Sequence, residues 1–70
     1  MADLFGGLPP APITIEDEIR CIERELKYRR RVYPHLVAKE AMEQAVADRE
    51  LHVLTAVLFR LQQIAEAGGR

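Results

Sequence analysis

The sequence predicts an all-α fold, an antiparallel helical hairpin preceded by a flexible Pro/Gly-rich tail. All four glycines lie near the chain ends, at positions 6, 7, 68 and 69, and three of the four prolines fall within the first twelve residues. Between residues 13 and 67 the one strong helix breaker is Pro34. Apolar side chains recur there every three or four residues, the period of one helix face. We therefore divide the chain into a tail (1–12), a helical hairpin (13–67) and a frayed end (68–70).

The first helix is expected over residues 14–39. Thr14 is a suitable N-cap because its hydroxyl can accept a hydrogen bond from a free backbone amide. Three acidic residues follow it, where the helix dipole favours negative charge. We call the apolar stripe that follows the first seam; its spacing is 4, 3, 4 and 7, and its members are Ile15, Ile19, Ile22, Leu26 and Tyr33.

Pro34 allows two versions of this helix. A proline clashes with the preceding turn and disfavours the helical conformation of the residue before it, so the helix could stop near Tyr33. Alternatively it kinks and continues to about Lys39. We prefer the kinked helix, because Leu36 and Val37 keep the phase of the first seam.

The second helix is expected over residues 43–67, with Gly68 as its stop signal. Its apolar stripe, the second seam, is spaced 4, 3, 4, 3, 4 and consists of Ala47, Leu51, Leu54, Leu58, Leu61 and Ala65. Val57 and Ile64 are expected to widen this stripe. The turn at residues 39–42 holds neither glycine nor proline and is weakly marked. A single unbroken helix is the alternative, and it would need a partner coil to cover both seams.

Composition excludes several classes of protein. The 70 residues carry a formal net charge of −1, and the single cysteine, Cys21, excludes an internal disulfide and, without clustered histidines, a zinc site. No apolar run approaches the roughly 20 residues of a membrane span, and the first seven residues lack the features of a secretory signal. A hairpin also offers no concavity that could desolvate a catalytic group. We expect a cytoplasmic, non-enzymatic protein without metal or cofactor.

A hairpin of this length is marginally stable without a disulfide, a metal or a second chain. A further apolar surface is therefore expected on stability grounds. The candidates outside the seams are Cys21, Tyr28, Val32, Val46, Val53 and Phe59. These residues either flank a wider core or contact a partner, and a homodimer that forms a four-helix bundle is one such arrangement.

Three more specific contacts are expected. Arg29 fills the vacant position of the first seam and should pair with Glu50 across the hairpin, unless both side chains simply face water. The spacing of Glu23 and Lys27, and that of Glu25 and Arg29, favours local ion pairs. In the tail, Leu8 and Ile13 are expected to fold back over one end of the hairpin.

Basic residues concentrate between positions 20 and 31, where six cations stand against two carboxylates. Such a patch could bind phosphates, but it could equally be a solvated helix face neutralised by nearby glutamates. The low pI of about 6.1 favours the second interpretation, so nucleic acid is expected only as an indirect partner. Surface reasoning selects six residues for contact with a protein partner: Arg24, Tyr28, Arg30, Arg31, Val32 and His35.

Part of this pattern resembles a known group of proteins. The segments 18–26, 29–34 and 47–50, which read EIRCIEREL, RRRVYP and ADRE, are similar to small phage and prophage two-helix proteins. The likeness covers roughly residues 15–61. It is similar in style to phage transcription inhibitors and antiterminators that bind bacterial RNA polymerase. The chain departs from that group at residues 40–43, EAME, where a glycine stop and a threonine cap are typical.

The resemblance implies a non-catalytic regulator that binds bacterial RNA polymerase and alters transcription, in the cytoplasm of a bacterial host. Two alternatives stay open. One is a self-assembling helical-bundle module, and the other is a nucleic-acid binding module that uses the basic run at residues 20–31.

Overall fold

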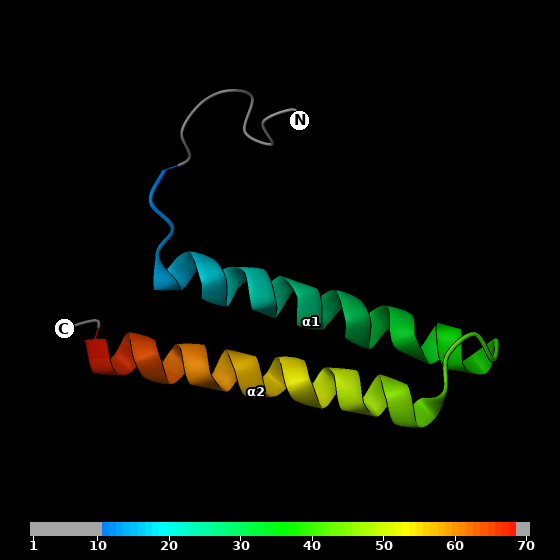
Figure 1. Ribbon diagram of the computed structural model, residues 1–70. Helices are drawn as coiled ribbons and strands as arrows, with labels where there is room; N and C mark the ends of the chain where they lie inside the picture. The colour runs from blue at the N-terminus through cyan, green and yellow to red at the C-terminus, as the bar shows by residue number, and fades with distance from the viewer. Residues whose placement is uncertain (1–10, 69–70) are drawn as a thin grey trace, which may run out of the picture.

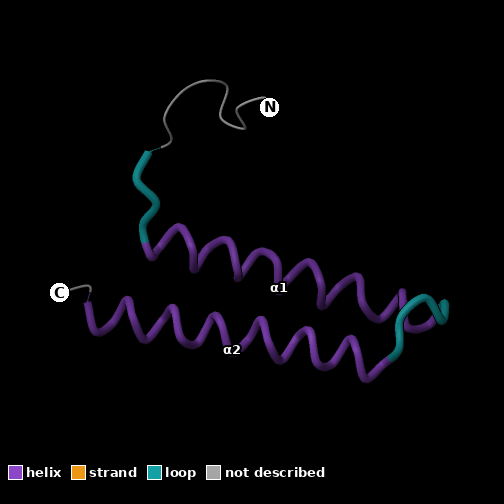
Figure 2. Tube along the Cα trace, in the orientation of Figure 1, coloured by secondary structure: helices purple, strands orange, loops and turns teal. Residues whose placement is uncertain are grey.

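Two helices packed side by side make up the protein in a computed structural model, which describes residues 11–68 (Figure 1). Helix α1 spans Ile15–Ala38 and helix α2 spans Gln44–Gly68. They run antiparallel and are joined by the loop 39–43 (Figure 2). The all-α hairpin is thus confirmed, and each predicted helix boundary is correct to one residue. Most of the predicted flexible tail, residues 1–10, and residues 69–70 of the predicted frayed end (68–70) lie outside the described residues. Gly68, expected in that frayed end, is instead the last residue of α2.

A capping box begins α1, as the N-cap prediction for Thr14 requires. The Asp17 amide donates to Thr14 Oγ1 at 3.1 Å, and the Thr14 amide donates to Asp17 Oδ2, also at 3.1 Å. Each side chain therefore satisfies a backbone amide that the helix itself leaves free. This reciprocal arrangement fixes the point at which the chain enters the helix.

Helix α1 continues through Pro34 to Ala38, so the alternative in which it stops near Tyr33 is wrong. Proline has no amide hydrogen, and the Arg30 carbonyl consequently lacks its usual helical donor. Packing on both sides of the proline offsets that loss, because Tyr33 is only 8% exposed and Leu36 and Val37 are half-buried.

The turn after α1 is a Schellman motif built without glycine. The Ala41 amide donates to the Leu36 carbonyl at 2.9 Å and the Glu40 amide donates to the Val37 carbonyl at 3.0 Å. Glu40 adopts the left-handed conformation with φ of 62°. Glycine is the usual residue at this position, which explains why the sequence marks the turn so weakly. The turn rules out the single unbroken helix.

The core is the contact between the two seams. Among residues 11–68, three side chains are buried, with exposed fractions of 2% for Leu26, 8% for Tyr33 and 2% for Ala47. The other residues of both seams are half-buried: Ile15, Ile19, Ile22, Leu51, Leu54, Leu58, Leu61 and Ala65. Ile13 is 71% exposed, so its predicted fold-back is wrong, while Leu8 lies outside the described residues. The seams suffice to close the hairpin and leave its other faces open.

The left-handed residue of the turn provides a stability prediction. Replacing Glu40→Gly should raise the free energy of unfolding by about 0.5–1 kcal/mol, because glycine adopts a positive φ without the steric cost that a side chain carries. Urea unfolding followed by circular dichroism measures the change. Lys39→Gly is the matched control; its φ is −86°, so the same substitution there should be destabilising. A Glu40→Gly protein no more stable than the parent would contradict the assignment of the turn.

The capping box predicts a pH dependence. Hydrogen bonds from the Thr14 amide and hydroxyl, helped by Arg20, hold the pKa of Asp17 below its ordinary value of 3.8. A carboxylate with a lowered folded-state pKa stabilises the fold above the unfolded value, and this contribution disappears as the pH falls through the folded value. The thermal midpoint of Asp17→Asn should therefore depend less on pH below about 4 than that of the parent. Glu16→Gln, which keeps both cap bonds, should retain the parent's acid dependence.

Candidate protein-interaction surface

A stripe of cations follows the side of α1 that faces away from α2. Arg20, Arg24, Lys27 and Arg31 are spaced 4, 3 and 4 residues apart, and we call them the basic edge. At about 100° per residue they fall within about 60° of one another, nearly opposite the first seam. With a rise of about 1.5 Å per residue, the basic edge extends for about 17 Å along the helix.

Most of the basic edge has no carboxylate partner. Arg20 pairs with Asp17 at 2.6 Å between Nη2 and Oδ1, and both side chains are exposed. The second ion pair within residues 11–68 joins Arg29 to Glu25. The expected pair of Glu23 with Lys27 does not form. Arg24, Lys27 and Arg31 are therefore available as cations for another molecule.

An aromatic side chain lies within the basic edge. Tyr28 is 53% exposed, and the guanidinium carbon of Arg31 lies 5.7 Å from the centre of its ring. This distance suits a cation–π contact, which holds the arginine over the ring and leaves its donors free. Together with Arg24 and Lys27, these two residues line a shallow hollow of about 350 Å³. The hollow offers an apolar ring surrounded by three cations.

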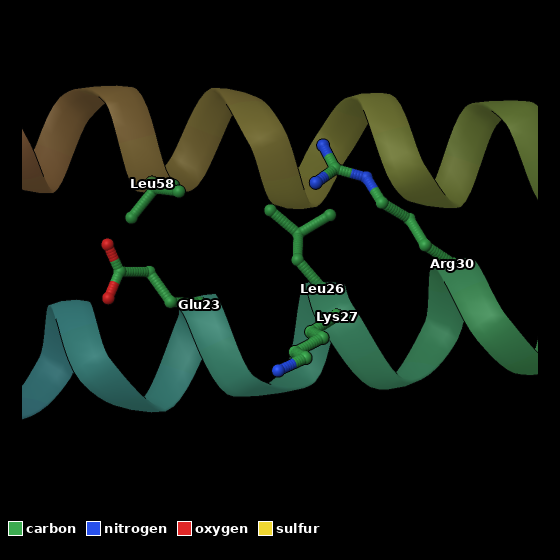
Figure 3. A pocket seen from close by; sticks show the side chains of 5 residues that line it. All are labelled: Glu23, Leu26, Lys27, Arg30 and Leu58. Carbon is green, nitrogen blue, oxygen red and sulfur yellow. The ribbon is translucent and has the colours of Figure 1, made fainter.

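A second shallow hollow, of about 430 Å³, opens where the two helices meet. Figure 3 shows Leu26 of α1 and Leu58 of α2 between the helices, with Glu23 and Arg30 extending toward α2 on either side. Lys27 lines this hollow as well as the first one. Through Lys27, the basic edge thus adjoins a further cation, Arg30, which lines the hollow between the helices.

The six residues expected to contact a partner are only partly gathered by the fold. Arg24, Tyr28 and Arg31 lie together around the first hollow. Arg30 belongs to the second hollow, while Val32 is half-buried and His35 is exposed, both outside either hollow. Sequence reasoning missed Lys27, which lines both hollows. The 4, 3, 4 spacing of the cations was the signal that could have identified it.

Arg29 does not pair with Glu50, so that expectation is wrong. Its Nη1 donates to the Tyr33 hydroxyl at 3.1 Å and its Nη2 donates to Glu25 Oε1 at 3.0 Å. The bond to the Tyr33 hydroxyl, and then that to Glu25, raises the pKa of the Arg29 guanidinium. Both partners lie four residues away on the same helix and reach Arg29 without crossing the hairpin. Arg29 is therefore directed along its own helix and does not contribute to the basic edge.

Other kinds of site find less support in the geometry. No group of three His, Cys, Asp or Glu side chains within residues 11–68 is arranged to hold a metal ion. Neither described helix combines the length and apolar character needed to cross a membrane. Cys21 is exposed and has a free thiol.

Comparison with known proteins adds no relative. No protein-family model, curated protein or solved structure gives a significant match to this chain.

Proposed function

We propose that this protein is a non-catalytic binding module whose basic edge docks on an acidic surface of a protein partner. The observation that supports it best is the absence of carboxylate partners for Arg24, Lys27 and Arg31 within residues 11–68. A helix face that served only solubility would gain from local ion pairs, and glutamates are available on the same helix. Three unpaired cations around an exposed tyrosine instead resemble the composition of protein interfaces, where Tyr and Arg are enriched.

The first partner to test is bacterial RNA polymerase, with altered initiation or termination of transcription as the consequence. The basis for this choice is the resemblance of residues 15–61 to small phage regulators. A regulator of this kind acts by contact alone. The shallow hollows on the described surface are consistent with that mode of action, because neither encloses a substrate.

Binding should depend on the basic edge and not on the total charge. The double variant Arg24→Ala/Arg31→Ala should weaken binding to purified bacterial RNA polymerase roughly tenfold, because it removes two exposed charge contacts and the cation–π partner of Tyr28. Biolayer interferometry at two salt concentrations measures the loss. In vitro transcription from a bacterial promoter, with and without the protein, tests the functional consequence.

Arg49→Ala is the matched control for charge. Arg49 is an exposed arginine on α2, outside the basic edge, and its removal should change the affinity less than twofold. Helicity by circular dichroism verifies that each variant folds. Absence of a complex with either core polymerase or holoenzyme would refute polymerase as the partner. Equal losses for the Arg49 and Arg24/Arg31 variants would refute the basic edge as the contact.

Nucleic acid is the second candidate, because the same cations could bind phosphates along about 17 Å of helix. The distinguishing measurement is binding to duplex DNA at low salt, where phosphate contacts are strongest. DNA binding that is lost in the Arg24→Ala/Arg31→Ala variant, together with no polymerase complex, would support the nucleic-acid module. No DNA binding at low salt would eliminate it.

A further inference from the structure

Helix α2 carries a second apolar stripe that α1 does not cover. We call it the outer stripe: Val46, Val53, Val57 and Ile64. Their exposed fractions are 46%, 48%, 36% and 57%, respectively, so the expectation that Val57 and Ile64 widen the second seam is wrong. At about 100° per residue they fall within about 40° of one another, and their centre lies about 100° from the second seam. Phe59, although 59% exposed, lies on the opposite side of the helix and does not belong to this stripe.

Two charges interrupt the outer stripe, and they have opposite signs. Glu50 lies between Val46 and Val53, and Arg60 lies between Val57 and Ile64. Neither forms an ion pair within the described residues. With them, the spacing along this face is 4, 3, 4, 3 and 4, that of a coiled-coil interface.

The outer stripe is symmetric about Thr55. Val46 and Ile64 lie nine residues before and after it, and Val53 and Val57 lie two residues before and after it. Glu50 and Arg60 lie five residues before and after it. Thr55 itself lies on the opposite side of α2 and marks only the level of the midpoint along the helix. Two copies of α2 placed antiparallel through their outer stripes, with the two-fold axis at this level, would match apolar with apolar residues and negative with positive charge at every position.

We propose that the outer stripe binds a second copy of this chain, as an antiparallel α2–α2 contact whose two-fold axis passes between the stripes at the level of residue 55. Glu50 of each copy then faces Arg60 of the other, twice per dimer. A parallel pair would place Glu50 against Glu50 and Arg60 against Arg60, which like-charge repulsion disfavours. The spacing 4, 3, 4, 3, 4 is its own mirror image in any such stripe, so what favours a second copy is the charge complementarity of Glu50 and Arg60.

The energetics of the hairpin agree with this assignment. In the described part of the chain, the core holds three buried side chains, Leu26, Tyr33 and Ala47, which is little for a protein whose single cysteine excludes an internal disulfide. Because the helices run antiparallel, the side of the hairpin that carries the outer stripe also carries Cys21 and Val32 of α1. Stacking two hairpins on this side produces a four-helix arrangement. The basic edge faces away from the side that carries the outer stripe. The proposed self-association therefore does not depend on the proposed function of the basic edge.

Charge reversal on the full chain provides the test. Glu50→Arg alone and Arg60→Glu alone should each weaken self-association roughly tenfold, because each replaces two attractive contacts by two repulsive ones. The double variant Glu50→Arg/Arg60→Glu should recover the parent's association. An equimolar mixture of the two single variants should form a heterodimer. Sedimentation equilibrium across a concentration series measures all four.

Glu66→Arg is the matched control, an equal charge change on the opposite side of α2 that should leave association unchanged. Circular dichroism shows whether each variant keeps its helices; a single variant that loses helicity when alone and regains it in the mixture also supports the proposal. A monomeric parent at every concentration would overturn it. So would a dimer in which the single variants associate as strongly as the parent, since that result places the contact elsewhere.

Discussion

The structure depends on one constraint: two helices can bury only one stripe of each against the other. The first and second seams fill that contact, with Leu26, Tyr33 and Ala47 buried at its centre. Pro34 is accommodated within α1 because the residues around it belong to this contact. Most other described side chains of the hairpin stay exposed. Within residues 11–68, no third helix or strand covers these exposed faces. Their apolar and charged side chains are therefore interpreted by what they could bind.

The helices and both seams could be predicted because a periodic pattern is redundant. Eleven seam positions repeat the same period, so no single residue decides the outcome. The turn is different, since it depends on one residue. Glu40 adopts a conformation that the sequence normally signals with glycine, and only the hydrogen bonds of Leu36 and Val37 reveal it. The partner of Arg29 was also missed, because its choice depends on a few individual side chains. Glu25 and Tyr33, four residues away on the same helix, compete with Glu50, and Arg29 binds these two nearer residues.

The candidate site shows why charge density in a sequence is a poor guide to a binding surface. Arg29, Arg30 and Arg31 are adjacent in the chain, yet each points about 100° away from the previous one. Arg29 bonds Glu25 and Tyr33, Arg30 lines the hollow between the helices, and Arg31 lies over Tyr28 on the basic edge. The run of three therefore supplies one cation to the basic edge. Lys27, outside the run, supplies another because it has the correct helical phase.

The two proposed contacts use different chemistry on different helices, and this separation has a consequence for affinity. The outer stripe is apolar and lies on α2, whereas the basic edge is charged and lies on the side of α1 that faces away from α2. Neither contact occludes the other, so the proposed dimer presents two basic edges at once. An exposed charge contact contributes little by itself, typically well under about 1 kcal/mol. On a partner that offers two acidic surfaces within reach, linking two such edges makes the second binding event intramolecular, which raises the overall affinity without adding any residue to either contact. On such a partner, pairing through α2 would compensate for the weakness of recognition through α1.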